Sequence, residues 1–351
     1  MLNIDEFLEY VKLQKFYNNQ IVHIETIPSK TAEFGGLDIP LHNSLMNWII
    51  KKDIRLWSHQ ADAINHILKG KNVVIATSTS SGKSFCYNFP VLDSILNNPN
   101  ITALYLFPRK ALTQDQYSEL IKLVEDLGLD KTLIGIYDGD TSSEDKRRIR
   151  QIANLVMTNP YALHQYLGFF QKLWYRICKN LKYIIIDEIH LYKGIFGTNV
   201  ALLLRRLKRL LEIYNVHPQW ILCSATINDP KGFAENLVGE QFELVNNDGS
   251  PSGAKKVILW DLPYDDLKNE YRSGNTESRN LFKCHLEHGI QTLMFTTSRK
   301  LAELQASWVK RELFQLTNRI STYRAGLSKE DRREIEHGLK LKKLLLSLIH
   351  I

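Results

Sequence analysis

The chain has 351 residues, 44% of them hydrophobic and 24% charged, which is typical of a folded globular protein and excludes a mainly disordered chain. Its 45 Lys and Arg residues outnumber 38 Asp and Glu residues, and the formal charge of +7 permits an anionic partner such as nucleic acid without requiring one. This length is sufficient for about two domains.

The cysteines and the N-terminus indicate the compartment. Four cysteines lie far apart without a C-x-x-C pair, which argues against a zinc knuckle or a disulfide scaffold and predicts buried thiols. Asp5, Glu6 and Glu9 stand where a signal peptide would carry basic residues. No apolar run approaches the roughly 20 residues of a membrane span. We therefore expect a cytoplasmic protein with no membrane partner.

Short β-rich runs alternate with longer amphipathic runs from residue 71 onward. This alternation predicts an α/β domain over residues 51–245, with a buried parallel sheet and helices on both faces, after a mixed leader at residues 1–50. The expected strands are residues 72–76, 102–107, 132–137, 154–158, 183–187 and 220–224. The expected helices are residues 83–96, 111–127, 143–152, 199–214 and 230–237.

A run rich in turn-forming residues follows the first domain and predicts a linker at residues 246–256. The β-then-α rhythm then restarts over residues 257–351, with a strand at 292–295 and helices at 277–286, 299–313 and 329–339. This second unit is too short to complete an α/β sheet. Its tail, residues 341–351, contains a leucine run that would expose apolar surface. We therefore expect the chain to be truncated, with foreign residues in this tail.

The stretch "TSTSSGKS", residues 77–84, lies between an apolar strand and a helical pattern. It fits the phosphate-binding loop G-x-x-x-x-G-K-[ST] except that Thr77 replaces the first glycine. In such a loop, backbone N–H groups and the helix N-terminus point at the phosphates, Lys83 reaches the β- and γ-phosphates, and Ser84 ligates Mg²⁺. The alternative is a serine-rich turn that caps a helix. The candidate phosphate-binding residues are Thr77, Ser78, Thr79, Ser80, Ser81, Gly82, Lys83 and Ser84.

The stretch "YIIIDEIH", residues 183–190, places two carboxylates directly after a buried strand. Asp187 would hold Mg²⁺, and Glu188 would orient or deprotonate the attacking water. The alternative is a solvated acidic loop, and His190 alone is more often structural than functional.

Two weaker signals complete the pattern. Ser224-Ala225-Thr226 follows the last expected strand of the first domain, and Gln60 carries an amide that can pair with an adenine edge. The alternatives are a helix N-cap for the first and an exposed helix face for the second.

In this order, the motifs resemble those of superfamily 2 helicases over roughly residues 50–340. They comprise the Q-type motif with Gln60, "TSTSSGKS", "FPRKALTQDQ", "TNPYALH", "DEIH", "SAT" and "MFTTSRKLAEL". Within the superfamily, the stretches "LWSHQADAI", "SSGKSFCYNFP", "DEIHLYKGIFGTNVALLLRRLKRL", "NNDGSPSGAKKVILW" and "YRAGLSKEDRREIE" are most similar to YprA-like helicases, also called MrfA-like.

The resemblance implies a RecA-like lobe that binds ATP and Mg²⁺, followed by an incomplete second RecA-like lobe. It further implies 3′ to 5′ translocation on single-stranded or partly duplex DNA, in DNA repair. Gln60 would then read adenine, and Asp187 and Glu188 would drive hydrolysis. Ser224 and Thr226 would couple the nucleotide state to the grip on DNA. Trp57 is a candidate to stack on the adenine base, unless it belongs to the core.

Nucleic-acid contacts are expected at the carboxyl ends of the strands in both lobes, where small polar and basic groups can bond to phosphates whatever the base. Such contacts predict strong salt dependence, with log K falling by about 0.7 per log salt for each neutralised phosphate on single strands. The candidates are Arg109, Lys110, Thr158, Asn159, Ser298 and Arg299.

Motifs V and VI, the latter with its arginine finger, have no counterpart in this sequence, which predicts an N-terminal fragment that binds ATP but unwinds little alone. An RNA helicase or a duplex translocase shares the same motifs, and a non-catalytic nucleic-acid-binding fragment would keep the same fold. A small-molecule P-loop kinase is disfavoured by the Ser-Ala-Thr motif and by the second β-α unit.

Overall fold

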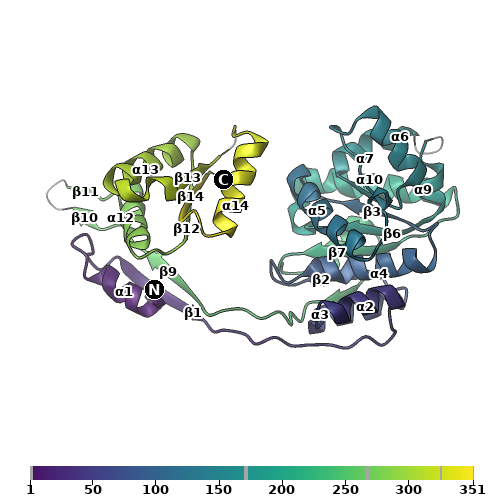
Figure 1. Cartoon of the computed structure of the whole chain (residues 1–351), viewed down its shortest axis with the longest axis horizontal. Coiled ribbons are helices and arrows are strands. Elements are labelled where there is room, and N and C mark those ends of the chain that lie inside the picture. The colour runs from purple at the N-terminus through teal and green to yellow at the C-terminus, as the bar shows by residue number, and fades with distance from the viewer. Residues whose placement is uncertain (1–2, 170–172, 266–268, 325, 351) are drawn as a thin grey trace. The chain divides into compact units, whose positions relative to one another are not determined.

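The chain forms two compact units in a computed structural model that describes residues 3–169, 173–265, 269–324 and 326–350 (Figure 1). The larger unit is residues 29–253, and the smaller combines residues 1–28 with residues 254–351. Residues 1–50 therefore do not form a separate leader, because the first 28 residues belong to the smaller unit and the others to the larger.

A seven-stranded parallel sheet organises the larger unit, in the order β4-β5-β3-β6-β7-β2-β8. Its residues alternate between two apolar clusters, so that Val73 and Ile75 pack on one face while Val74 packs on the other. Burial on both faces explains the nearly continuous apolar runs. In sheet order the strands are Ile134–Ile136, Leu155–Thr158, Thr102–Leu106, Leu181–Ile186, Gln219–Ser224, Val73–Ala76 and Glu243–Val245.

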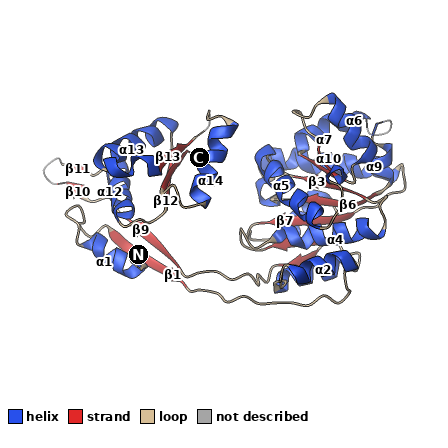
Figure 2. Cartoon of the chain, viewed as in Figure 1, coloured by secondary structure: helices blue, strands red, loops and turns tan. Residues whose placement is uncertain are grey.

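Helices cover both faces of this sheet (Figure 2). One face packs against α2 (Asn43–Lys51), α3 (Ser58–Leu68), α4 (Lys83–Asn97) and α5 (Lys110–Asp126). The other packs against α6 (Ser143–Ile152), α7 (Pro160–Tyr166), α9 (Tyr175–Lys179), α10 (Gly194–Glu212) and α11 (Pro230–Val238). Single 3-10 turns lie at Lys131–Leu133, Leu167–Phe169 and Ile189–Leu191. The α/β fold expected for this part of the chain is confirmed.

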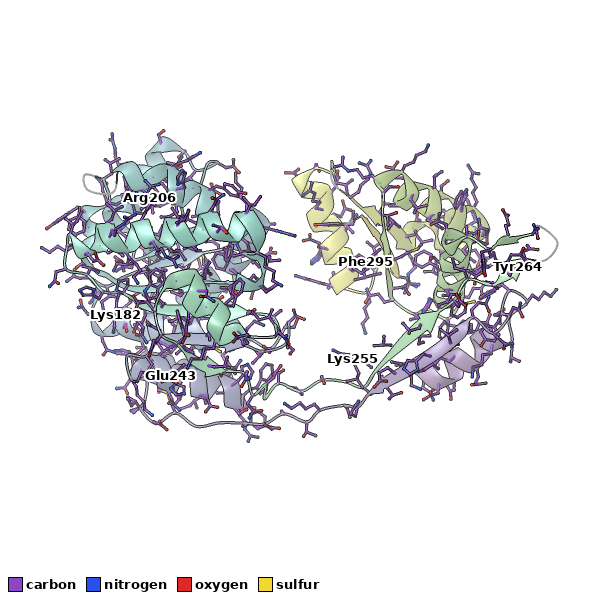
Figure 3. The ribbon with its side chains drawn as sticks, turned by 180° about the vertical axis from the view of Figure 1, so that it is seen from behind. Lys182, Arg206, Glu243, Lys255, Tyr264 and Phe295 are labelled. Atoms are coloured by element: carbon purple, nitrogen blue, oxygen red, sulfur yellow. The ribbon has the colours of Figure 1, made fainter. Side chains whose placement is uncertain are left out.

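The smaller unit is built from both ends of the chain. Strand β1 (Ile21–Ile27) pairs antiparallel with β9 (Lys255–Trp260), and α1 (Ile4–Lys12) packs Phe7 and Val11 near Cys284. Strand β10 (Tyr264–Asp265) pairs antiparallel with β11 (Glu270–Tyr271). Both Tyr264 and Phe295 are exposed side chains (Figure 3).

A three-stranded parallel sheet follows in the order β12-β14-β13. Strand β14 (Leu346–His350) is central, between β12 (Thr292–Thr296) and β13 (Ile320–Tyr323). The helices are α12 (Gly274–Glu287), α13 (Arg299–Glu312) and α14 (Lys329–Lys340), with a 3-10 segment at Phe314–Arg319.

The tail and the predicted linker both carry buried residues. The leucine run of the tail is not simply exposed as expected, because Leu345 is buried and the residues after it form the central strand β14. The linker predicted at residues 246–256 begins within the larger unit, where Gly249 and Ser250 are buried.

The other expectations tested here concern cysteines and membrane spans. All four cysteines are free and buried, as predicted. No helix among the described residues is long and apolar enough to cross a membrane.

Candidate active site

Three neighbouring strands of the larger sheet carry the predicted nucleotide motifs at their carboxyl ends. The register aligns Ala76, the last residue of β2, with Ser224, the last residue of β7. On the other side of β7, Ile186 at the end of β6 aligns with Leu222. Because the strands are parallel, the phosphate loop, the Ser-Ala-Thr motif and the Asp187-Glu188 pair leave the sheet at the same edge.

Left-handed backbone conformations shape the phosphate loop. Gly82, immediately before α4, has a φ of +64°, and Ser80 has a φ of +66°. A Cβ atom on Gly82 would lie 2.6 Å from Nε2 of Gln60 and 3.3 Å from the Trp57 ring. Only glycine fits there, because it tolerates both the positive φ and the close packing. Thr77 at the first loop position leaves this turn intact.

The loop is closed by its own side chains. The Lys83 ammonium donates hydrogen bonds to the carbonyl oxygens of Ser78 at 2.7 Å and of Thr77 at 3.2 Å. The hydroxyls of Thr77 and Ser81 are buried and lie 2.6 Å apart. Lys83 is therefore held over the loop, where it can exchange carbonyl partners for phosphate oxygens.

Helix α3 and the residue before it contact the phosphate loop. Gln60 is 3% exposed; its Nε2 donates to the carbonyl of Gly82 at 3.0 Å, and its Oε1 accepts from the Trp57 amide at 3.0 Å. Each bond uses half of the amide's donor or acceptor capacity, so one donor and one acceptor position remain for a base edge. Trp57 is half-buried and lies against the loop.

The two carboxylates after β6 differ in their surroundings. Asp187 is 7% exposed, and burial, followed by the negative charge of Glu188, raises the pKa of its carboxyl to about 7. Its Oδ1 accepts the Glu188 amide at 2.8 Å. Glu188 has a φ of +53°, a strained conformation for a non-glycine residue; the residue is half-buried, and its buried Oε2 has no hydrogen-bond donor among the described residues.

His190 connects the acidic motif to the Ser-Ala-Thr motif. Its Nδ1 accepts the Ala225 amide at 3.2 Å and lies 3.1 Å from Oε2 of Glu188. A nitrogen that accepts from Ala225 has no proton for Glu188, so this short contact is not a salt bridge. Ser224 is fully buried and its hydroxyl has no partner within the described residues, whereas Thr226 is exposed.

This donor set fits a magnesium ion. Mg²⁺ prefers hard oxygen ligands from a few side chains together with water and phosphate. Among the described residues, no cationic group hydrogen-bonds to the buried carboxylate of Asp187 and Oε2 of Glu188 lacks a donor, and Ser84 is the second residue of the helix that follows the loop. The ion would be held by Ser84 and Asp187.

The comparison with known families decides the assignment. Residues 57–232 match the family model described as DEAD/DEAH box helicase. The chain belongs to this family. The match begins at Trp57 and ends in α11, so it includes the phosphate loop, the acidic motif and the Ser-Ala-Thr motif.

Individual relatives agree. ATP-dependent helicase hrq1 of Schizosaccharomyces pombe is 37% identical, over 97% of this chain and 34% of its own length. The uncharacterized ATP-dependent helicase YprA of Bacillus subtilis is 38% identical, over 92% of this chain and 44% of its own length. The expected resemblance to YprA-like helicases is confirmed.

Solved structures give the same result. The crystal structure of the DUF1998 helicase MrfA bound to DNA is similar to this chain with a TM-score of 0.91 and 35% identity, over 100% of this chain and 49% of that one. MrfA bound to DNA and AMPPNP gives a TM-score of 0.91 at 36% identity, over 99% of this chain and 48% of that one. The chain thus spans from a third to a half of the length of these relatives.

The predicted nucleic-acid residues of the larger unit fall into two groups. Arg109 and Lys110 are exposed after β3, and Lys110 pairs with Asp140 at 2.8 Å. Thr158, the last residue of β5, and Asn159, which follows it, are buried: the Thr158 hydroxyl donates to the Tyr137 carbonyl at 2.6 Å, and Asn159 caps α7 by accepting the Ala162 amide at 3.0 Å. The Thr158 hydroxyl is therefore used within the fold, whereas the cap uses Oδ1 of Asn159 and leaves its NH₂ group as a donor. Phosphate contacts from these two residues stay a prediction.

Ser298 and Arg299 belong to the smaller unit. Ser298 caps α13 by accepting the Leu301 amide at 3.1 Å, and the Arg299 side chain is exposed. A nucleic-acid contact from either residue stays a prediction.

Sequence reasoning missed two residues that hold the phosphate loop of the helicase. His59 is fully buried between the loop and residue 249, and Asp248 binds the loop at Ser78. For His59, the only local signal in the sequence is its position beside Gln60. For Asp248 the sequence offers no signal, because its partners are distant in the chain.

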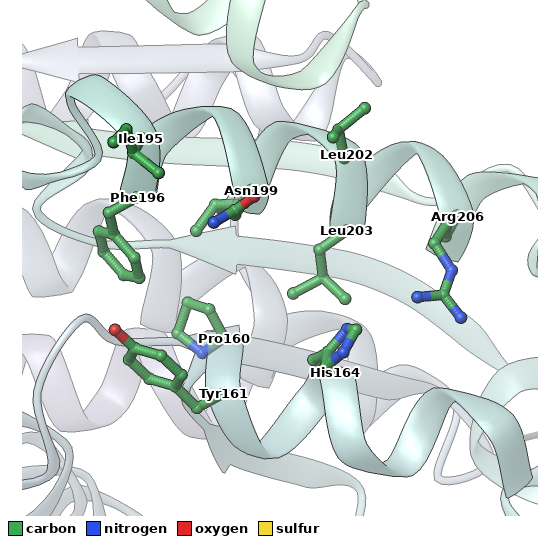
Figure 4. Close-up of a pocket in the computed structure, with 10 residues that line it drawn as sticks. Pro160, Tyr161, His164, Ile195, Phe196, Asn199, Leu202, Leu203 and Arg206 are labelled. Carbon is green, nitrogen blue, oxygen red and sulfur yellow. The ribbon is translucent and has the colours of Figure 1, made fainter.

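A separate cavity of about 670 Å³ lies between α7 and α10 (Figure 4). Its walls are mainly apolar, with Tyr161, Phe196 and Leu203 among them, and Arg206 stands at one end. It shares no residue with the phosphate loop or the acidic motif, and a nucleotide would find few polar partners there. We therefore place the nucleotide site at the sheet edge.

Proposed function

We propose that this chain carries the ATP-binding part of a DNA helicase that couples ATP hydrolysis to movement on DNA. The observation that supports this most directly is the convergence of three motifs at the carboxyl ends of β2, β7 and β6. Phosphate binding, carboxylate chemistry and a coupling motif are thereby brought to one edge of one sheet.

The residues divide the chemistry between them. Backbone amides of the loop and Lys83 bind the phosphates, and the left-handed turn at Gly82 lets the backbone approach them closely. When bound, Mg²⁺ neutralises charge that develops on the phosphate oxygens. Glu188 orients the attacking water and accepts its proton, and its Oε2 has no hydrogen-bond donor among the described residues.

DNA is the proposed polymer, with 3′ to 5′ movement and a repair role as expected from the resemblance to YprA-like helicases. The MrfA structure bound to DNA supports this choice, since its TM-score with this chain is 0.91. Arg109 and Lys110 lie at the same sheet edge as the nucleotide motifs, because β3 pairs parallel with β6. Movement of that edge can therefore link nucleotide state to phosphate contacts.

Nucleotide binding by the Lys83→Ala variant tests the site. We expect its affinity for Mg·ADP, measured by calorimetry, to fall by at least about tenfold, because a charge-assisted phosphate contact is lost. Lys69→Ala is the matched control, since Lys69 lies on the same lobe in an exposed pair with Asp38. Equal affinities of wild type and Lys83→Ala would overturn the assignment.

Competition between DNA and RNA oligonucleotides of equal sequence tests the polymer. We expect single-stranded DNA to compete at least as well as RNA, with affinity that falls steeply with salt. Preferential binding of RNA would favour the RNA helicase alternative, and affinity that does not depend on salt would contradict both.

A further inference from the structure

The segment between the larger sheet and β9 is fastened to the phosphate loop. Residues 246–253, named here the connector, follow β8 and lead directly into β9. The turn-forming residues of this segment predict a linker, and within it Gly249 and Ser250 are buried. Two independent groups of hydrogen bonds tie the connector to the loop.

Asp248 makes the first tie. Its Oδ1 accepts the amide of Ser250 at 2.9 Å and the hydroxyl of Ser250 at 2.6 Å, an Asx turn that fixes the orientation of the carboxylate. Its Oδ2 accepts the amide of Ser78 at 2.9 Å and the hydroxyl of Ser78 at 2.5 Å. Although burial opposes ionisation, these hydroxyl and amide donors from Ser250 and Ser78 hold the pKa of Asp248 well below its usual range.

His59 makes the second tie. Its Nε2 donates to the carbonyl of Ser81 at 2.8 Å, and its Nδ1 accepts the amide of Gly249 at 3.2 Å. This arrangement requires a neutral ring, and burial lowers the pKa of His59 accordingly. The 3.7 Å approach of Nδ1 to Oδ1 of Asp248 is therefore not an ion pair. The loop is thus held at both Ser78 and Ser81.

Close packing leaves the connector little freedom at Gly249. A Cβ atom there would lie 2.2 Å from the Ser58 hydroxyl and 2.7 Å from the Glu33 carbonyl oxygen. The Gly249 carbonyl accepts the Glu33 amide at 2.9 Å, and Lys30 pairs with Ser252 across an antiparallel bridge. Both stretches of chain that leave the larger unit are therefore bound beside the phosphate loop.

We propose that Asp248 is a positioning residue for nucleotide binding, which holds the first half of the phosphate loop in its binding shape and couples that shape to the connector. The inference rests on the proposed nucleotide site. Ser78 is held from outside by Asp248, so Lys83 can leave the Ser78 carbonyl for a phosphate without collapse of the loop. A loop fixed in advance binds its ligand without the cost of ordering it.

Coupling is reciprocal, so nucleotide must stabilise the connector as much as the connector stabilises the nucleotide site. The amides of Gly249 and Ser250 report this directly, because each donates one of the bonds described above. Because nucleotide binding also stabilises the whole fold, coupling is shown by protection of these amides beyond that of other amides in the larger unit.

Asp248→Asn tests the proposal in the full chain. The amide NH₂ group must face either the Ser78 donors or the Ser250 donors, so one pair of bonds is lost at nearly constant volume. We expect about tenfold weaker Mg·ADP binding by calorimetry at 20 °C. Asp38→Asn, which removes an exposed carboxylate of the same unit, is the control and should bind as wild type does. Ser250→Ala removes only one donor to Asp248 and should weaken binding by about twofold to threefold.

Hydrogen exchange gives the second readout. We expect Mg·ADP to slow exchange of residues 246–253 several-fold in wild type and not in Asp248→Asn. If Asp248→Asn melts at lower temperature but binds Mg·ADP as wild type does, or if nucleotide leaves exchange of the connector unchanged, the proposal is wrong. If Asp248→Asn does not fold, Ser250→Ala decides through the same two measurements. Loss of binding in Lys83→Ala with full binding in Asp248→Asn would contradict this inference alone and leave the nucleotide site standing.

Discussion

The phosphate loop and the acidic motif leave the same sheet edge but differ in how completely their polar groups are satisfied. In the loop, Lys83, Gln60 and the Ser78 amide all have partners within the protein. At the other motifs, Oε2 of Glu188 and the Ser224 hydroxyl lack hydrogen bonds among the described residues, and Asp187 is a buried carboxylate beside another carboxylate.

The satisfied polar groups of the loop maintain its shape, whereas the unsatisfied groups of the other motifs are available to a ligand. Unsatisfied buried groups and strained backbones are costly, and they persist where a ligand completes them. The loop is therefore prepared to receive a phosphate with little rearrangement, whereas the carboxylate side is left unstable until metal and nucleotide arrive. Substitutions on the two sides should accordingly change stability and binding in different proportions.

The largest expected effect is on the loop itself. Gly82→Ala should lower the free energy of unfolding by about 1–3 kcal/mol and weaken Mg·ADP binding more than tenfold, because the new Cβ would meet Gln60 and the positive φ is strained. Gly70→Ala is the matched control: Gly70 has a φ of +78° and nothing within 4 Å of an added Cβ. Denaturant melts and calorimetry of both variants separate strain from collision, and equal nucleotide affinity in both would contradict the loop geometry.

On the carboxylate side, stability and binding should move in opposite directions. Asp187→Asn removes a buried charge and its repulsion by Glu188. We therefore expect the free energy of unfolding of the ligand-free protein to rise by about 1 kcal/mol, while the Mg²⁺ dependence of nucleotide binding is lost. Chemical denaturation at pH 8, with and without Mg·ADP, measures both. Asp62→Asn, at an exposed position, should change neither. A less stable Asp187→Asn protein would show that the carboxylate is satisfied.

A smaller effect concerns pH and the His59 tie. Because burial lowers the pKa of His59 in the folded state, the unfolded chain binds the proton more readily, and stability is full above about pH 6.5 and declines as the pH falls below that value. The charged groups that face His59 are Asp248, which opposes this shift, and Lys83 and Lys30, which reinforce it.

Thermal melts of wild type between pH 7.5 and 5.5 should therefore show a fall that His59→Gln lessens. The exposed His217 provides the control, since His217→Gln should retain the wild-type slope. Identical pH profiles for wild type and His59→Gln would show that the His59 ring is not held neutral.

The smallest effect belongs to Ser224. Its buried hydroxyl has no partner within the described residues, so Ser224→Ala should change the free energy of unfolding by no more than about 0.5 kcal/mol. Urea melts measure this. A fall in the free energy of unfolding of more than about 1 kcal/mol would show that the Ser224 hydroxyl makes a stabilising hydrogen bond.

The sequence predicts the larger unit well because its signals are local. Apolar runs mark the strands, and α6 spans Ser143–Ile152, the range that its periodicity predicts. The positions of Asp187 directly after a strand and of Lys83 at the start of a helix follow from the same pattern. Helix α7 shows the limit: Asn159 before Pro160 is a capping signal that explains the contact of Oδ1, whereas a phosphate contact from its NH₂ group stays a prediction.

Contacts between distant segments could not be predicted in this way. Strand β1 pairs with β9, which follows it in the sequence only after the whole larger unit. Neither strand has a sequence that identifies the other as its partner. The turn-forming residues around Asp248 indicate a loop correctly but not that Ser78 binds it. Composition predicts the backbone conformation of such segments, whereas their partners depend on the complete fold.

The order of segments along the chain has a consequence for domain architecture. Residues 29–253 are an uninterrupted stretch with its own sheet and core, and they lie between the two stretches that make the smaller unit. Topologically, the larger unit is an insertion in a host domain, at the junction between β1 and β9. The antiparallel pairing of those two strands brings the ends of the host gap together, so a short turn could replace the insert and leave the host ladder closed.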